Sequence, residues 1–265
     1  MKQPFKVEGK IRLKDFDPAF CNGMDKEDAK SQTIKWGQRI GELQHLLYAN
    51  ARHALVVLFQ GMDASGKDGA VRRVLEFVNP AGVQTANFKI PSAEEIAHDY
   101  LWRVHHAVPR YGYIGVFNRS HYEDVLIVRV LNLQPPEVWK ERFDQINAFE
   151  KFLADNRILL LKFFLHIGKS EQADRFKERL DDPSKNWKFS MDDLKMRAHW
   201  DAFQKAYEDV LNHCSTGHAP WHIVPSDRKW FRDYLVAKVV AKALEDLDMH
   251  WPKPKEDLSK IKIDD

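Results

Sequence analysis

Short continuous apolar runs alternate with amphipathic segments along most of the chain. The apolar runs are typical of buried strands and cover residues 55–60, 84–90, 113–118, 158–166 and 221–225. In the other segments apolar residues recur every three to four positions, as on one face of a helix. These segments cover residues 26–49, 71–78, 92–106, 137–156 and 227–247. The alternation predicts an α/β fold, a parallel five-stranded sheet with helices on both faces, and a ligand at the carboxyl ends of the strands.

One stretch, residues 170–213, breaks this alternation. It is rich in Lys, Arg, Asp and Trp and is interrupted at Asp181-Asp182-Pro183. We interpret it as an inserted helical hairpin that stands off the sheet, with Ser190 and Asp193 forming the capping box of its second helix. The inward face of that second helix would consist of Trp200, Phe203, Tyr207 and Val210. In phosphoryl-transfer enzymes such a hairpin often acts as a closing lid.

The two ends of the chain have the composition of surface segments. Pro and Gly are scattered among charged residues in 1–24, and two prolines interrupt the charged stretch 251–265. We expect the first to wrap the surface as an arm and the second to form a tail. The whole chain, residues 1–265, is therefore predicted to be a single domain.

A phosphate-binding motif follows the first apolar run. The sequence Gly61-Met62-Asp63-Ala64-Ser65-Gly66-Lys67-Asp68-Gly69 fits the spacing G-x-x-x-x-G-K. In such a loop the backbone N–H groups turn toward phosphate oxygens, the lysine reaches the transferring phosphate, and the next helix directs its positive end at the anion. The alternative is an accidental glycine-rich turn, which the strand before it and the helix after it disfavour.

The residue after the motif lysine is unusual. A nucleotide phosphate loop normally offers Ser or Thr there to a magnesium ion, whereas this chain has Asp68, and Asp63 is a second carboxylate within the loop. Both carboxylates are therefore predicted metal ligands, for Mg²⁺ or for Mn²⁺ in its place.

The third strand ends in a second polar segment, Phe117-Asn118-Arg119-Ser120-His121-Tyr122-Glu123-Asp124. Its polar residues emerge at the sheet edge where a phosphate-loop fold organises its metal and phosphates. Asn118 can bind a water or a phosphate but adds no charge. Arg119 could stabilise charge on the transferring group, or it could only pair with carboxylates of the next helix. Glu123 could orient or deprotonate an acceptor, or it could only face the helix dipole.

Basic residues gather in the hairpin. Arg175, Lys177, Arg179, Lys185 and Lys188 lie within fourteen residues, together with Trp187. They could grip a polyanion and exclude water when the hairpin closes. Alternatively they form a solvated face that nearby Asp and Glu residues neutralise. Arg72 could extend the basic track beside the phosphate loop. The histidines have no metal-ligand spacing.

Composition narrows the class of protein. Of 265 residues 44% are hydrophobic, and 41 Lys and Arg stand against 39 Asp and Glu. A near-neutral chain is unlike a general nucleic-acid or membrane-surface binder, so we expect neither partner. Two cysteines without metal spacing, and no apolar run long enough to span a membrane, lead us to expect a cytoplasmic location.

At these residues the chain closely resembles the polyphosphate kinase 2 family. The resemblance rests on the phosphate loop with Asp68, on the segment from Phe117 to Asp124, and on the hairpin stretch from Arg179 to Lys188, and it spans most of residues 30–250. It implies reversible, magnesium-dependent phosphoryl transfer between inorganic polyphosphate and a nucleotide, in a phosphate-loop kinase-like fold. Relatives assemble as dimers or tetramers, so we expect a homodimer or homotetramer.

The resemblance also assigns roles to residues. The family's loop lysine corresponds to Lys67, its metal-organising acids to Asp63 and Asp68, its strand-end arginine to Arg119 and its lid arginine to Arg179. Asn118 stands where relatives that mainly phosphorylate nucleoside diphosphates carry Asp, which resembles the subclass that accepts both AMP and ADP. The expected catalytic residues are Asp63, Lys67, Arg119, Glu123 and Arg179. The expected phosphate- and nucleotide-binding residues are Gly61, Ala64, Ser65, Gly66, Lys67, Asp68, Gly69, Arg72, Asn118, Ser120 and Lys188.

Two other functions fit parts of the pattern. An ATP-dependent small-molecule or nucleoside kinase would share the loop, but it should carry Ser or Thr at position 68. A non-catalytic scaffold could hold polyphosphate on the same lysine and arginines without turning it over. Within the enzyme hypothesis, in-line attack by the nucleotide phosphate is favoured over a covalent phosphoryl intermediate on Glu123.

Overall fold

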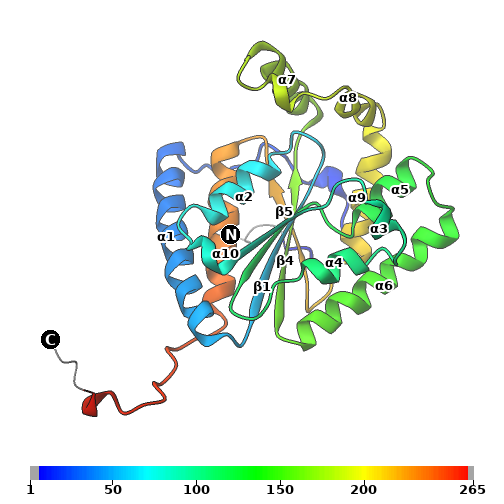
Figure 1. Ribbon diagram of the computed structural model, residues 1–265. Helices are drawn as coiled ribbons and strands as arrows, with labels where there is room; N and C mark the ends of the chain where they lie inside the picture. The colour runs from blue at the N-terminus through cyan, green and yellow to red at the C-terminus, as the bar shows by residue number, and fades with distance from the viewer. Residues whose placement is uncertain (1–5, 262–265) are drawn as a thin grey trace.

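A parallel five-stranded sheet forms the centre of the molecule (Figure 1). The computed structural model describes residues 6–261, so the expectations for residues 1–5 and 262–265 lie outside the described part. The strands lie in the order β2 (Val83–Asn87), β3 (Ile114–Asn118), β1 (Ala54–Gln60), β4 (Ile158–His166) and β5 (Trp221–Pro225), and all neighbouring pairs are parallel. The predicted sheet is confirmed, and β1, the strand before the phosphate loop, lies at its centre.

Helices cover both faces of the sheet, as predicted (Figure 1). One face packs against α1 (Lys26–Asn50), α2 (Lys67–Leu75) and α10 (Lys229–Glu245). The other packs against α4 (Trp102–Ala107), α5 (Glu123–Val130), α6 (Pro136–Asp155) and α9 (Trp200–His213). Alternation along β1 explains the two cores, since Val56 and Leu58 point to the second face while Leu55, Val57 and Phe59 point to the first.

The helix expected over residues 92–106 is instead two short helices, so that prediction is wrong. Ser92 and Glu95 form the expected capping box, but α3 (Ala93–Ile96) is only 4 residues long. Between it and α4 the side chain of Asp99 accepts a hydrogen bond from the backbone N–H of Leu101 at 3.0 Å. This local bond competes with helical hydrogen bonding and turns the chain before α4 begins.

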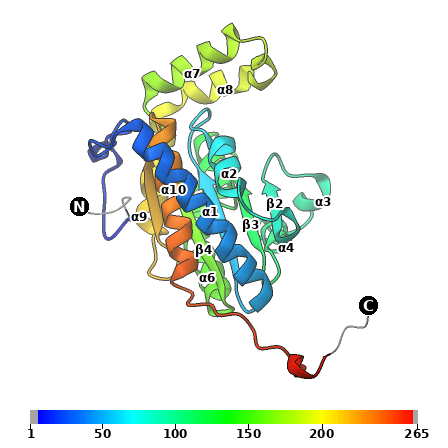
Figure 2. The ribbon, with the colours of Figure 1, turned by 90° about the vertical axis from the view of Figure 1, so that its left-hand side faces the viewer.

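The hairpin is smaller than expected. Helices α7 (Lys169–Asp181) and α8 (Met191–Ala198) stand above the carboxyl ends of the strands (Figure 2). The expected second helix is divided at His199, and α9 returns to the body of the molecule, where its apolar face is buried in the core. Ser190 caps α8 by accepting from the N–H of Asp192. The expected reciprocal partner, Asp193, pairs with Arg179 instead.

The remaining 3-10 turns and the two end segments complete the fold. The turns are Leu13–Asp15, Pro80–Gly82, Asn186–Lys188 and Leu258–Lys260. The N-terminal arm is docked, because Val7 and Leu13 are buried and the N–H of Val7 donates to the carbonyl of Trp221 at 2.9 Å. Residues 251–261 run away from the body as an exposed tail (Figure 2). Within residues 6–261 no helix has both the length and the apolar character needed to cross a membrane.

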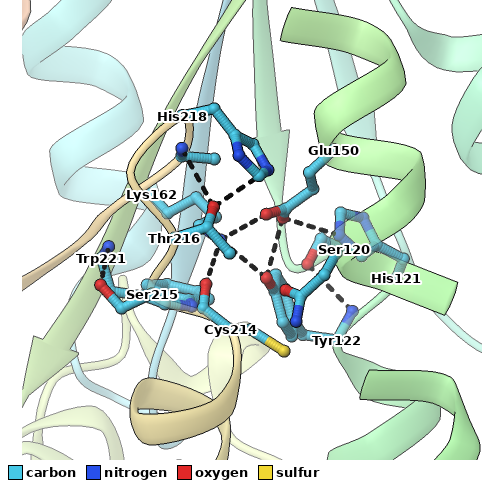
Figure 3. A network of polar contacts seen from close by, with 12 residues as sticks. Ser120, His121, Tyr122, Glu150, Lys162, Cys214, Ser215, Thr216, His218 and Trp221 are labelled. Atoms are coloured by element: carbon cyan, nitrogen blue, oxygen red, sulfur yellow. Dashed lines mark hydrogen bonds and ion pairs between the residues drawn. The ribbon is translucent and has the colours of Figure 1, made fainter. Parts of the chain in front are cut away.

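A fully buried ion pair links β4 to α6 (Figure 3). Lys162, in the middle of the apolar run of β4, donates to Glu150 of α6, to the hydroxyl of Tyr122 at 2.8 Å and to the carbonyl of Cys214 at 2.6 Å. Tyr122 and His121 also contact the Glu150 carboxylate. Burial raises the pKa of Glu150, but Lys162 and His121 outweigh it and hold the pKa below its ordinary value. The network therefore contains a carboxylate with its charge satisfied.

Substituting Lys162→Met should destabilise the protein by about 3–5 kcal/mol, because it leaves a buried carboxylate without its cation. Urea unfolding measures the change. Lys162→Met combined with Glu150→Gln should cost less than the single substitution. Lys151→Met, which removes an exposed pair with Asp155, serves as the matched control and should change stability by less than about 0.5 kcal/mol. Equal, small effects at positions 162 and 151 would contradict the assigned role of the network.

Candidate functional site

The phosphate loop joins β1 to α2 in a conformation that depends on glycine. Gly66 precedes α2 with a φ of +100°. A Cβ added there would lie 1.8 Å from Nη1 of Arg232, and a Cβ on Gly69 would lie 2.8 Å from Nη2 of the same residue. The left-handed backbone favours glycine at position 66, and the Arg232 guanidinium occupies the space that a Cβ would take.

Lys67 folds back over the loop. Its side chain is buried, and Nζ donates to the carbonyl oxygens of Gly61 at 2.7 Å and of Met62 at 3.1 Å. Burial, followed by the charge of Arg119, lowers the pKa of Lys67 to about 8. The ammonium group is thus held inside the loop by carbonyl groups, and it can exchange these weak partners for phosphate oxygens.

The loop carboxylates are tied to the end of β3. Asp68 accepts a hydrogen bond from Nδ2 of Asn118 at 2.8 Å, and Asp63 pairs with Arg119 at 2.7 Å. Arg119 also pairs with Glu123 at 3.4 Å. The charge of Glu123, opposed by burial and assisted by Asp63, raises the pKa of Arg119. Two segments that are 50 residues or more apart in sequence are therefore brought together, as the strand-end motif predicted.

The basic residues of the hairpin have two different environments. Arg175 is buried and donates to the carbonyls of Ala64 at 2.8 Å and Ser226 at 2.6 Å, so it fixes the loop to the end of β5. Arg179 pairs with Asp193 at 2.9 Å. Lys177 pairs with Asp174 on the exposed surface, which matches the alternative of a locally neutralised face.

Two more hairpin lysines reach toward the loop. Lys185 lies between Glu178 and Asp182, at 2.7 Å and 2.8 Å. Lys188 lies over the ring of Trp187, with Nζ 4.9 Å from the centroid. Lys188 forms no ion pair with a carboxylate among residues 6–261 in the structure, whereas Lys185 forms two, so Lys188 is the more readily available to an anion.

These side chains line a common cavity of about 490 Å³. Its lining contains nine basic and five acidic side chains and so carries a positive charge. Of the residues predicted for the site it includes Asp63, Ala64, Gly66, Lys67, Asp68, Gly69, Arg72, Asn118, Arg119, Arg179 and Lys188. A concave, cationic surface around a phosphate loop suits a ligand with several phosphate groups.

Four predicted site residues do not line this cavity. Gly61 is part of the loop backbone, and Ser65 is fully buried beneath it. Ser120 is also fully buried, and its hydroxyl accepts from Nε2 of Gln60 and from the N–H of Tyr122, both at 3.2 Å. Glu123 reaches the site through its pair with Arg119. The structure thus places Ser120 and Glu123 as supports of the strand-end segment.

The start of α10 contributes cavity residues that were not predicted from the sequence. Lys229, Arg232 and Asp233 line the cavity, and the Arg232 side chain is 4% exposed. Burial lowers the pKa of Arg232, whereas the charge of Asp233 opposes that change. The signal was available, because α10 follows the fifth strand at the same carboxyl edge of the sheet where the ligand was expected.

Among residues 6–261 the structure shows no cluster of three or more His, Cys, Asp or Glu side chains suited to hold a metal ion. Five carboxylates line the cavity, and the two that were predicted as metal ligands, Asp63 and Asp68, are the ones within or directly after the phosphate loop. Mg²⁺ is commonly held by one or two carboxylates together with substrate phosphates and waters. The donor set therefore fits a metal that arrives with a phosphorylated ligand.

Comparisons with known proteins agree with this geometry. The family model described as polyphosphate kinase 2 (PPK2) matches residues 23–252. An AMP/ADP-polyphosphate phosphotransferase of Meiothermus ruber is 48% identical over 261 residues, which are 97% of each chain. An ADP-polyphosphate phosphotransferase of Rhodopseudomonas palustris is 46% identical over 228 residues, 82% of this chain and 79% of that protein. The crystal structure of polyphosphate kinase 2 from Arthrobacter aurescens TC1 superposes with a TM-score of 0.95 at 39% identity, covering 97% of this chain and 94% of that chain.

The pKa of Lys67 predicts how anion binding depends on pH. Above its pKa of about 8 the lysine loses its charge, so the affinity for pyrophosphate, used as a probe, should fall by about tenfold between about pH 7 and about pH 9. Isothermal titration calorimetry at several pH values measures the fall. The Lys67→Met variant should bind pyrophosphate more weakly, and its affinity should not fall between about pH 7 and about pH 9. A parallel decline in both proteins would assign the titration to another group.

Proposed function

The chain belongs to the polyphosphate kinase 2 family, and we propose that it transfers the terminal phosphoryl group of inorganic polyphosphate to AMP and to ADP. The products are ADP and ATP, together with a polyphosphate shortened by one unit. The observation that carries the proposal is the phosphate loop whose carboxylates, Asp63 and Asp68, are bonded to Arg119 and Asn118 inside one cationic cavity.

The donor end of polyphosphate would lie in the loop. Backbone N–H groups at the start of α2 point toward this position, and the helix dipole favours negative charge there. Lys67 would leave the carbonyls of Gly61 and Met62 for the phosphate oxygens. Arg175 holds the carbonyl of Ala64, so the loop keeps its shape while the lysine changes partners.

The acceptor would approach from the end of β3. A terminal phosphate oxygen of AMP or ADP attacks the terminal phosphorus of the donor and forms a new P–O bond. The P–O bond to the rest of the chain breaks, and its electron pair leaves with the shortened polyphosphate. Lys67 and Arg119 neutralise the charge that is spread over the transferring group, which is the main contribution that a protein makes to this reaction.

Glu123 fits a positioning role in this reaction. The attacking phosphate oxygen already carries a negative charge near neutral pH, so it needs no base. The carboxylate of Glu123 is 13% exposed, does not line the cavity and pairs with Arg119. It therefore aims the guanidinium, and both its burial and its pairing speak against a covalent phosphoryl intermediate on this residue.

A divalent metal, Mg²⁺ or Mn²⁺ in its place, would be held by Asp63 and Asp68. Each carboxylate uses Oδ1 for its neighbour, Arg119 or Asn118. Neither Oδ2 atom has a hydrogen-bond partner among residues 6–261 in the structure. The metal would supply positive charge to the donor and acceptor phosphates. Asn118 and Arg119 orient the two carboxylates toward the cavity before any ligand arrives.

The hairpin would close over the bound phosphates. Arg179 and Lys188 line the cavity from α7 and from the turn after it. Closure would bring both cations onto the donor and would keep water from competing with the nucleotide. We further propose a cytoplasmic location, from cysteine usage, and a homodimer or homotetramer, from the family resemblance.

The first experiment supplies long-chain polyphosphate, Mg²⁺ and either AMP or ADP to the purified protein and resolves the nucleotides by chromatography. We expect ATP from both acceptors. Asp68→Asn should lower the rate by about 10²-fold, because it removes charge next to the transferring phosphates. Asp174→Asn on the exposed face of α7 is the matched control and should leave the rate unchanged.

The other outcomes of this assay separate the alternatives. Consumption of ADP alone would refute the inference from Asn118 and keep the family reaction. Binding of polyphosphate without transfer to either nucleotide would favour a scaffold. Metal removal with EDTA should abolish transfer, and Mn²⁺ should restore it if the site accepts that ion.

Asn118→Asp tests the metal-binding role of the neighbouring Asp68. The substitution replaces a hydrogen bond of 2.8 Å with two facing carboxylates, which repel unless a cation lies between them. Without divalent ions the variant should be less stable than the wild type by about 1 kcal/mol. Millimolar Mg²⁺ should remove most of this difference. Thermal unfolding with and without Mg²⁺ measures this stability difference. A difference that stays the same when Mg²⁺ is added would argue against metal binding at Asp68.

A further inference from the structure

Arg232 has a buried guanidinium group that the catalytic scheme does not use. Nε and Nη2 both donate to Oδ1 of Asp233, at 2.9 Å and 2.6 Å. Nη1 points at the loop beside Gly66 and makes no hydrogen bond with the described residues of the protein. The Arg232 side chain is 4% exposed and lines the site cavity. Asp233 thus orients a buried cation toward the loop and leaves one of its donors for a ligand.

A second hollow begins where the site cavity meets α10. It has a volume of about 620 Å³ and lies between the first turns of α1 and α10, beside Arg73 of α2. Both helices begin at the end of the sheet that lies below the hairpin (Figure 2). Lys229 and Asp233 line both hollows. We name this second hollow the α1–α10 groove.

The groove is basic. Five cationic side chains line it, against two carboxylates. The cations are Lys26, Lys30, Arg73, Arg228 and Lys229, and the acids are Asp227 and Asp233. Asp227 is committed to the backbone N–H of Gly168 at 2.7 Å, and Asp233 to Arg232. The two carboxylates are thus engaged within the protein. Of the cations, Lys30, Arg73 and Lys229 pair with carboxylates outside the groove lining, whereas Lys26 has no acidic partner among residues 6–261 in the structure.

Topology separates this groove from the acceptor side of the site. The phosphate loop follows β1, the central strand of the sheet order β2-β3-β1-β4-β5. The acceptor side is built at the end of β3, whereas α10 follows β5 on the opposite side of the loop. A long donor bound in the loop must extend away from the acceptor, because the acceptor attacks its terminal phosphorus from the side opposite to the leaving chain.

We propose that the α1–α10 groove binds the part of the polyphosphate donor that lies beyond its reacting end. The polyphosphate chain would run from the loop past Arg232 and Lys229 into the groove. There its phosphates would contact Lys26, Lys30 and Arg228. The inference rests on the proposed donor, and it predicts a preference for long chains. A donor too short to reach the groove gains nothing from these cations.

The test compares the binding of tripolyphosphate and of long-chain polyphosphate to Lys26→Ala/Lys30→Ala. Both side chains lie in the first turns of α1 and are exposed, so the fold should persist. Calorimetry should show a Kd for the long chain raised by about fivefold, and a smaller change for tripolyphosphate. The salt dependence of long-chain binding should also become shallower, because fewer counterions are released.

The matched control is Lys140→Ala/Lys151→Ala, which removes the same charge from the exposed face of α6. Equal affinities of the groove variant and this control for long chains would overturn the proposal. An equal loss for tripolyphosphate and long chains would overturn it as well, because the cations would then act at the reacting end or through the general field. The outcome is separate from catalysis: weakened long-chain binding without nucleotide phosphorylation would support the groove and refute the proposed reaction.

Discussion

Concentrating positive charge around an open loop is the constraint on which the rest of this structure depends. Guanidinium and ammonium groups that converge on one point repel each other and lose hydration. Each of the central cations is therefore held by one or more acceptors of the protein. Lys67 is held by loop carbonyls, Arg119 by Asp63 and Glu123, and Arg232 by Asp233. The field is assembled before a phosphate arrives, so little reorganisation accompanies binding.

The two sides of the loop are supported by different forces. On the donor side α1, α2 and α10 pack through apolar side chains against one face of the sheet. On the acceptor side the turn after β3 is fixed by directional polar bonds. Tyr122, three residues after Arg119, is bonded to Glu150 and to Lys162, which are fully buried. These bonds can all form in one geometry only, so they fix the backbone of the turn. The fixed backbone in turn sets the direction of the Arg119 side chain.

Sequence patterns within single segments predicted the strands and the phosphate loop, because these features depend on neighbouring residues. Apolar runs located the strands to within a few residues, since a central parallel strand is buried on both faces. The loop spacing located the anion site, because its backbone geometry follows from glycine and from the start of α2. The same signals failed where a polar bond overrides periodicity. Asp99, for example, ends a helical pattern early. The strand over residues 158–166 was predicted correctly although Lys162 interrupts its apolar run, because Glu150 on the neighbouring helix satisfies the charge of Lys162.

The missed site residues depend on tertiary contacts. Arg232 lies 166 positions after Gly66 in the chain. The alternation of strands and helices places the start of α10 at the carboxyl edge of the sheet, but no local motif shows that the Arg232 side chain reaches Gly66. The approach exists because β5 runs parallel to the other strands, so α10 begins at the same edge of the sheet as the phosphate loop. Ser120 shows the opposite case, in which a contact expected from the sequence stays a prediction. Its polarity and its place after β3 suggested a ligand contact, whereas its hydroxyl is used by Gln60 and Tyr122 inside the fold.

The base of the hairpin is bonded to the loop, and this limits how the hairpin can move. Gln172 donates to the carbonyl of Asp63 at 2.8 Å and accepts from Arg197 at 2.7 Å, so the start of α7 and the end of α8 share one link to the loop. Arg175 adds the bond to Ala64. The distal part is held by pairs within the hairpin, such as that between Arg179 and Asp193. A closing movement must therefore bend the hairpin beyond Arg175, or it must move the backbone of Asp63, and with it a predicted metal ligand.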